Sequence, residues 1–342
     1  MKDSNHLNDK IYSVLKNEIK EKKICLLDLP NYYNPGDQLI WEGNEQIFEK
    51  LGVKIKYRSS LHFFNPLKVS KSDCIVLQGG GNFGDLYSKH QKFREYIIST
   101  YPDNKIIILP VTIHFSNKIN LTKSAKLFSK HKNLVICVRD NNSYKIVEDN
   151  FMSSKNYLLP DTAFAIENIE KNIIKKPSNK VLFLRRTDKE KGKNSSKNTI
   201  NLIKYLDVSD WPTYDQREIK LSSHLFFLYL NRLILKCWKI FGLHWSEKND
   251  VYGIIKFHSK ERQINSAVEF LNQYDLVIST RLHGHILACL LGIPNIMLNN
   301  SYGKNKNFYE TWMMNNTLNT YFADSEKSVK RIIKDKFPEL VK

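Results

Sequence analysis

The chain has 342 residues, of which 42% are hydrophobic and 26% charged, and this balance excludes a disordered or fibrous protein. Its length favours two domains, because a domain with a single hydrophobic core rarely exceeds roughly 250 to 300 residues. The net charge of +18 favours polyanions, anionic lipid headgroups or phosphorylated small molecules as partners. The five widely spaced cysteines indicate reduced thiols rather than a disulfide framework or a cysteine zinc site.

The first half of the chain alternates short apolar runs with amphipathic stretches, which is typical of a parallel sheet covered by helices. The start is polar and rich in Lys, without the apolar run of a secretory signal, so we expect a cytoplasmic protein. A helix is predicted over 37–51, where apolar residues recur near a period of 3.6 and Gly52 follows. The predicted strands of this half are 24–28, 74–78, 105–109, 134–138 and 157–159.

Charge, Pro and Ser in 170–180 indicate a linker, after which a second set of elements begins. Strands are predicted at 180–184, 276–279 and 295–298, and helices at 264–271 and 283–291. The predicted fold is α/β, with one Rossmann-like domain over 1–170 and a second over 171–342. The second domain carries an amphipathic insertion around 215–262.

The insertion contains an apolar run, 225–243, that charged and polar residues interrupt. Each charge near the centre of a membrane-spanning helix costs about 2.5 to 3.5 kcal/mol, so the run is not expected to cross a bilayer. Two interpretations stay open. The segment forms either an amphipathic helix at the inner face of the plasma membrane, in contact with anionic lipid, or a helix packed between the domains.

Polar residues follow two strands of the first domain. Asn34, Gly36 and Asp37 stand between a strand and a helix, at the edge of a parallel sheet where ligands bind. Asp37 is equally compatible with a simple helix cap. The run Gly79, Gly80, Gly81, Asn82 and Asp85 follows another strand, and its backbone N–H groups suit an anion. The run matches neither a dinucleotide fingerprint nor a P-loop, and a packing turn is the alternative.

The strongest candidates lie in the second domain. Arg281 and His283 stand at the start of a predicted helix, where the helix dipole and free N–H groups favour a phosphate or carboxylate. His283 is then placed to donate a proton. His285, two residues on, points away from His283, so we predict no metal site and a packed His285. Further polar residues at predicted strand ends are Arg139, Asp161, Arg185 and Arg186.

Taken in order, these motifs resemble the polysaccharide pyruvyl transferase family. The resemblance rests on NPGD (34–37), QGGGNFGD (78–85), VRD (138–140), LPDTAF (159–164), STRLHG (279–284) and SYGKNKNFYETW (301–312). It implies a fold similar to the GT-B glycosyltransferases, with two Rossmann-like domains facing a cleft. The donor it implies is phosphoenolpyruvate, a co-substrate, with no further cofactor.

The resemblance also assigns roles to the residues. The family's RLHG motif falls on Arg281, Leu282, His283 and Gly284, with the Arg binding the donor and the His catalytic. A second donor-binding Arg falls on Arg185 or Arg186. Asp37 would be catalytic, facing the acceptor and orienting or deprotonating it. Asn34, Gly36, the glycine run, Asn82, Asp85, Arg139 and Asp161 would form the acceptor side of the cleft.

The implied acceptor is a sugar of a surface polysaccharide or capsule, free or carried on a lipid. Two competing functions stay open at this point. A GT-B glycosyltransferase that uses a nucleotide sugar would share the fold and the basic cleft. A non-enzymatic protein that binds polyanions or membranes would share the charge, although no nucleic-acid-binding module is found and nucleic acid is not expected as a partner.

Overall fold

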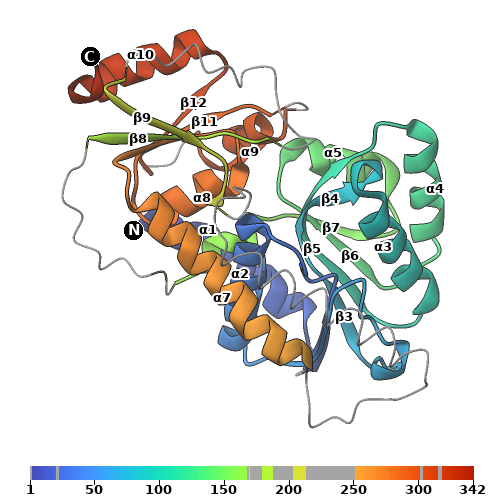
Figure 1. The fold of residues 1–342 in the computed structure, drawn as a ribbon. Coiled ribbons are helices and arrows are strands. Elements are labelled where there is room, and N and C mark those ends of the chain that lie inside the picture. The colour runs from blue at the N-terminus through green and yellow to red at the C-terminus, as the bar shows by residue number, and fades with distance from the viewer. Residues whose placement is uncertain are drawn as a thin grey trace.

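The computed structural model describes residues 2–20, 23–167, 169, 179–187, 203–212, 251–300, 303–314 and 318–342. Two parallel sheets, one in each half of the chain, form the framework of these residues (Figure 1). The segments 170–178 and 213–250, which contain most of the predicted linker and the apolar run 225–243, lie outside the described residues. Within the described residues, no helix is long and apolar enough to cross a membrane.

The first sheet has the strand order β2-β1-β3-β5-β6-β7, with β4 paired to β5. Alternate residues of each strand enter separate cores, because successive side chains of a strand point to opposite faces. Ile24 and Leu26 of β1 pack under α1 and α2, whereas Cys25 and Leu27 pack under α3, α4 and α5. The strands are β1 (Lys23–Leu27), β2 (Lys54–Ser59), β3 (Cys74–Leu77), β4 (Gly80–Gly84), β5 (Ile106–His114), β6 (Leu134–Val138) and β7 (Lys155–Leu158). The helices are α1 (Lys2–Glu18), α2 (Pro35–Lys50), α3 (Ser88–Thr100), α4 (Lys118–Phe128) and α5 (Asn141–Asn150), with short 3-10 helices at Pro66–Lys68, Asp85–Tyr87 and η3 (Thr162–Ala165).

The second sheet has the order β12-β11-β10-β8-β9. One face is covered by α7, α8 and α9, and the other by α10. The strands are β8 (Lys180–Leu184), β9 (Tyr205–Ser209), β10 (Leu276–Ser279), β11 (Asn295–Leu298) and β12 (Thr320–Ala323). The helices are α7 (Val251–Leu271), α8 (Leu282–Leu290), α9 (Lys304–Trp312), α10 (Glu326–Lys336) and a final 3-10 turn, Pro338–Leu340.

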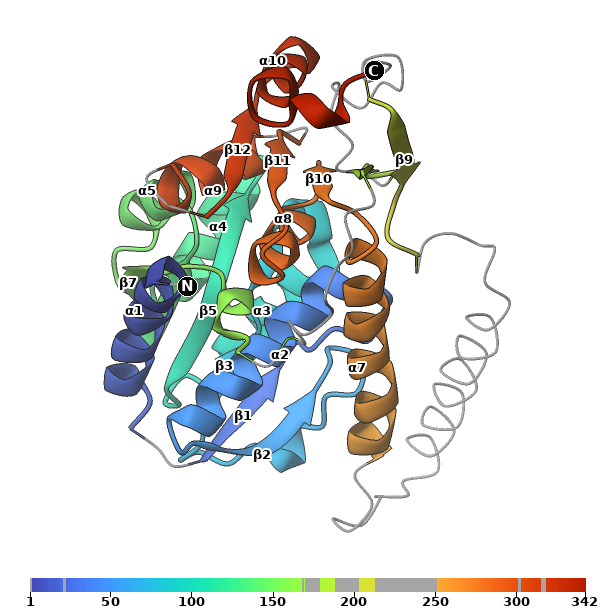
Figure 2. The same ribbon diagram turned by 90° about the vertical axis from the view of Figure 1, so that its left-hand side faces the viewer.

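The two domains share an apolar core. Leu39 of α2 and Phe164 of η3 belong to the same buried cluster as Ile286 of α8 and Phe308 of α9. The rings of Phe164 and Phe308 stack, with centroids 6.3 Å apart and planes 3° apart. Helix α7 lies along α2, as Figure 2 shows, and Lys260 of α7 binds Glu42 and Glu45 of α2. These contacts fix the first domain against the second.

The predicted fold class is confirmed, and most buried strands begin and end within two residues of their predicted positions. Several elements differ, as two examples show. The glycine run is not only a turn, because Gly80–Gly84 forms β4 alongside β5 and buries Phe83 in the core. The helix predicted over 264–271 begins at Val251, within the range assigned to the insertion.

Candidate active site

A cavity of about 400 Å³ lies where the first turns of α2, α3, α8 and α9 meet. It stands at the carboxyl ends of parallel strands, the usual ligand-binding edge of such sheets. Both domains supply its lining: Tyr32, Asn34, Asp37, Gly81, Asn82, Tyr87 and His90 from the first, and Arg186, Trp211, Arg281, Leu282, His283 and Lys304 from the second.

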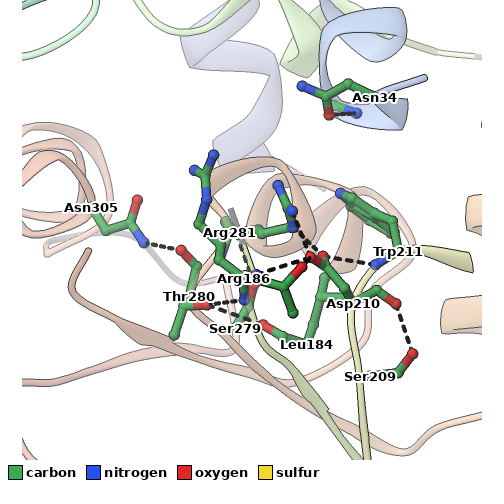
Figure 3. Close-up of polar contacts among 12 residues, drawn as sticks. Asn34, Leu184, Arg186, Ser209, Asp210, Trp211, Ser279, Thr280, Arg281 and Asn305 are labelled. Atoms are coloured by element: carbon green, nitrogen blue, oxygen red, sulfur yellow. Dashed lines mark hydrogen bonds and ion pairs between the residues drawn. The ribbon is translucent and has the colours of Figure 1, made fainter. Parts of the chain in front are cut away.

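Arg281, directly before α8, is held by a buried carboxylate. Its Nε and Nη2 atoms bind the two oxygens of Asp210, with Nη2 2.7 Å from Oδ2 (Figure 3). Asp210 also accepts a hydrogen bond from the Thr187 hydroxyl at 2.9 Å. A bidentate pair fixes the plane of a guanidinium, so Asp210 sets the direction of Arg281. No sequence pattern indicated Asp210, because β9 before it was not predicted.

The structure distinguishes the two arginines that follow β8. Arg186 is 8% exposed, lines the cavity and donates its backbone N–H to the Thr280 hydroxyl at 2.9 Å. Arg185 donates its backbone N–H to the Ser209 carbonyl and does not line the cavity. In Figure 3 the guanidinium groups of Arg186 and Arg281 lie on the side of the second domain that faces Asn34.

His283 lies between the two domains. Its Nε2 atom is 3.3 Å from Oδ2 of Asp161, and both side chains are nearly buried. On its other side the ring packs against Gly36 of α2, where an added Cβ would lie 2.5 Å from Nδ1 and 2.7 Å from the histidine Cβ. Only glycine allows this approach, so the NPGD motif of one domain supports the histidine of the other.

Asp161 is itself paired with Arg139, whose side chain is fully buried. Burial alone would raise the pKa of Asp161, but the charges of Arg139 and His283 outweigh it and hold the pKa well below its usual value. Asp161 is therefore a carboxylate, and its Oδ2 atom faces Nε2 of His283. Arg139 also donates from Nε to the Thr112 hydroxyl at 3.0 Å, while its buried Nη2 has no hydrogen-bond partner among the described residues.

The glycine run brings a lysine into the cavity. Gly81 leaves room for Nζ of Lys304, and its missing Cβ would also lie 3.4 Å from Nη2 of Arg139. Lys304 is only 5% exposed and begins α9. Gly79 packs against the backbone of Pro110, and Gly80 has a φ of 122° that favours glycine. Lys304 lies within the SYGKNKNFYETW motif (301–312), but it was not among the predicted site residues.

Other predicted residues have structural partners. Asp37 lines the cavity, and its Oδ2 accepts hydrogen bonds from the Tyr32 hydroxyl at 2.9 Å and from Asn34 at 2.6 Å. Asp85 does not line the cavity, because its carboxylate accepts from the backbone N–H groups of Ser116 and Asn117 before α4.

The helix after Arg281 also contains packing residues. Leu282 lines the cavity, whereas Gly284 packs against Leu184 and Ser279. His285 is fully buried against Asn295, as predicted. Among the described residues, no cluster of His, Cys, Asp and Glu could hold a metal ion.

The arrangement suits a small ligand with several negative charges. Arg186, Arg281 and Lys304 line the cavity, and Arg139 lies directly behind Gly81. Among the residues that line it, Asp37 carries the one carboxylate. Because Arg186, Arg281 and Lys304 are each at most 8% exposed, they act at a lower effective dielectric than surface cations and bind phosphate and carboxylate groups strongly.

The chain is similar to known proteins over most of its length. The model of the polysaccharide pyruvyl transferase family matches residues 34–302. The chain is 36% identical to a Bacillus subtilis (strain 168) protein named "Putative pyruvyl transferase EpsO", over 91% of this chain and 93% of that protein. It is 28% identical to "Pyruvyl transferase 1" of Schizosaccharomyces pombe, over 87% of this chain and 71% of that protein.

A solved structure has the same fold. It is a functionally uncharacterised protein from Klebsiella pneumoniae, with a TM-score of 0.61, 21% identity, and coverage of 93% of this chain and 99% of that one. The family match spans both domains and every residue that lines the cavity except Tyr32 and Lys304. The chain therefore belongs to the polysaccharide pyruvyl transferase family.

Proposed function

We propose that this transferase moves a pyruvyl group from phosphoenolpyruvate to two hydroxyls of one sugar and forms a pyruvate ketal. The observation that carries the proposal is the position of His283, ion-paired with Asp161 and set among Arg186, Arg281 and Lys304. Phosphoenolpyruvate carries a phosphate and a carboxylate on three carbons. An acid beside several cations suits a donor of this kind.

The phosphate and carboxylate of the donor would occupy the cationic side of the cavity. Arg281 and Arg186 present guanidinium groups there, and the N-terminus of α8 adds its dipole. Lys304 supplies a third positive charge, and the unpartnered Nη2 of Arg139 lies close behind Gly81. The Arg185 alternative is less suitable, because Arg185 lies outside the cavity lining.

His283 would donate its proton to the methylene carbon of the donor, with Asp161 stabilising the charged imidazolium. The electron pair of the C=C bond takes up that proton, which leaves a cationic C2. One sugar hydroxyl then forms a C–O bond to C2, and a second hydroxyl displaces phosphate as the C2–O bond to phosphate breaks. Of the two hydroxyl protons released, one replaces the proton of His283 and the other leaves with phosphate.

The competing glycosyltransferase would need a site for a nucleotide base and ribose. Asp37, the one carboxylate among the described lining residues, is already bound to Tyr32 and Asn34 and is poorly placed for a ribose. A cavity of about 400 Å³ also fits a small donor better than a nucleotide sugar. We retain a surface polysaccharide or its lipid-linked precursor as the acceptor and the cytoplasm as the proposed location. Contact with an anionic membrane would involve 225–243, outside the described residues.

Thermal stabilisation by phosphoenolpyruvate, beside a panel of nucleotide sugars, tests the donor. Wild type should be stabilised by phosphoenolpyruvate, and Arg281→Ala and Arg186→Ala should lose most of that shift. Arg185→Ala is the matched control, since it removes the neighbouring arginine outside the cavity, and it should keep the shift. Stabilisation of wild type by a nucleotide sugar alone would refute the donor assignment.

A further inference from the structure

A second histidine–aspartate pair lies in the same cavity as His283. His90, in the first turn of α3, lines the cavity, and its Nδ1 atom is 2.8 Å from Oδ1 of Asp28. The ring is 14% exposed and the Asp28 side chain 1% exposed. Neither residue belongs to the motifs that carry the family resemblance, and the donor chemistry above leaves both without a role.

Asp28 is held in an unusual backbone conformation. It follows β1 and has a φ of 63°, in the left-handed region that few residues other than glycine adopt. Such strain persists where surrounding structure imposes it, and it is common at functional sites. Here it accompanies a carboxylate buried between His90 and Arg94, whose Nη2 is 3.8 Å from Oδ2 of Asp28.

The contacts of His90 define its tautomer. A buried carboxylate at 2.8 Å accepts a proton from Nδ1, which leaves the lone pair on Nε2. The amide nitrogen of Asn82 lies farther from Nδ1, at 3.3 Å, so the shorter contact with Asp28 decides the tautomer, and the Asn82 amide oxygen accepts from Arg94. The Tyr32 ring packs edge-on against His90, with centroids 6.1 Å apart. No hydrogen bond joins Nε2 to another described residue, so the lone pair is available in the cavity.

The proposed reaction needs a base as well as an acid, because each acceptor hydroxyl must lose a proton as its oxygen bonds to C2. Asp37 was the sequence candidate, but its Oδ2 already accepts from Tyr32 and Asn34. A neutral imidazole oriented by a carboxylate is a better proton acceptor near neutral pH. The two histidines come from different domains, His283 from the second and His90 from the first.

We propose that His90, oriented by Asp28, is the general base that deprotonates the acceptor sugar hydroxyl. His90 accepts the hydroxyl proton at Nε2 as the sugar oxygen forms its bond to C2, and it then passes that proton to the departing phosphate. Asp28 acts as a positioning residue through Nδ1. The proposal rests on the proposed function, since it concerns the acceptor half of the same reaction.

The test measures phosphate release from phosphoenolpyruvate with a mixture of methyl glycosides of glucose, galactose, mannose and their N-acetyl forms as acceptors. His90→Gln should lower kcat about 100-fold or more, the usual contribution of a general base. Stabilisation by phosphoenolpyruvate should stay as in wild type, because the donor cations are untouched. His131→Gln is the matched control, since that histidine is buried in the same domain and bonds the Tyr101 carbonyl outside the cavity.

Two further variants separate catalysis from folding. Added imidazole should restore turnover to His90→Ala but not to His283→Ala, which a purely structural role for His90 would not produce. Asp28→Asn should lower kcat and make kcat increase less steeply with pH. The KM for phosphoenolpyruvate should not change. A His90→Gln enzyme with wild-type kcat, or His90→Ala without imidazole rescue, would overturn the base assignment. No phosphate release by wild type with any glycoside would instead count against the proposed function itself.

Discussion

The contact between Gly36 and His283 gives the sharpest structural prediction. In Gly36→Ala the new methyl group would lie 2.5 Å from Nδ1 and 2.7 Å from Cβ and Cγ of His283. Ordinary carbon contacts are near 3.5 Å or more, so the ring or the start of α2 must move by about 1 Å. The atoms in the way are at the base of the side chain, so a simple rotation of its tip does not relieve the clash.

We expect Gly36→Ala to cost about 1 to 3 kcal/mol of stability, as overpacking usually does. Because a displacement of about 1 Å in a catalytic group can cost about 100-fold in rate, kcat should fall by up to that factor. Phosphate release from phosphoenolpyruvate with the methyl glycoside mixture measures the rate. Thermal stabilisation of the protein by phosphoenolpyruvate should persist, since Arg186 and Arg281 are not displaced.

Gly52→Ala is the matched control at the other end of α2. Its φ is +68° with nothing within 4 Å of an added Cβ, so alanine should cost about 1 to 2 kcal/mol through backbone strain alone. This variant should lose stability and keep its kcat. The opposite outcome is that Gly36→Ala keeps the wild-type kcat, or loses no more kcat than Gly52→Ala does. In that case the position of His283 would not depend on its contact with Gly36 of the first domain.

Three further predictions follow from single contacts. Asp210→Asn should raise the KM for phosphoenolpyruvate about tenfold in steady-state assays, because a neutral amide holds the Arg281 guanidinium less firmly. Gly81→Ala should leave the melting temperature nearly unchanged but weaken donor binding in calorimetry, because it displaces the flexible tip of Lys304. Burial lowers the pKa of His285 to about 4 despite the hydrogen bond that its Nδ1 donates to the Asn295 amide oxygen, so the unfolded chain binds a proton that the folded chain does not. Stability should therefore fall by about 2 kcal/mol between pH 6.5 and pH 5, as denaturant titrations would show, and His285→Gln should lessen that slope.

The strands that sequence reasoning predicted best are those buried on both faces. Four predicted strands match the structure: 134–138 is β6, 180–184 is β8, 276–279 is β10 and 295–298 is β11. A short continuous apolar run bounded by polar turns is typical of a buried parallel strand and is compatible with few other structures. β2 was missed since it lies at the sheet edge and contains three basic residues. β4 was missed because glycine has no side chain to carry a strand pattern.

The site was predictable only where motifs mark it. Arg281, His283 and Asp37 stand at helix starts after strands, a position that sequence spacing reveals, and all three line the cavity. The choice between Arg185 and Arg186 depends on which way a strand end faces, which the sequence leaves undetermined. Asp210 follows a strand that was not predicted, and Lys304, although it lies in the 301–312 motif, reaches the cavity only through the tertiary packing of α9.

The apolar core shared by the two domains has a consequence for folding. Leu39 and Phe164 of one domain are shielded from solvent by Ile286 and Phe308 of the other. Each half by itself would therefore expose apolar side chains to water. Separately expressed halves would expose this cluster and aggregate, and the intact chain should melt in one cooperative calorimetric transition. A wide hinge opening would break the same contacts. Substrates must then enter and leave through the existing mouth of the cavity, and the distances among the catalytic groups are set when the chain folds.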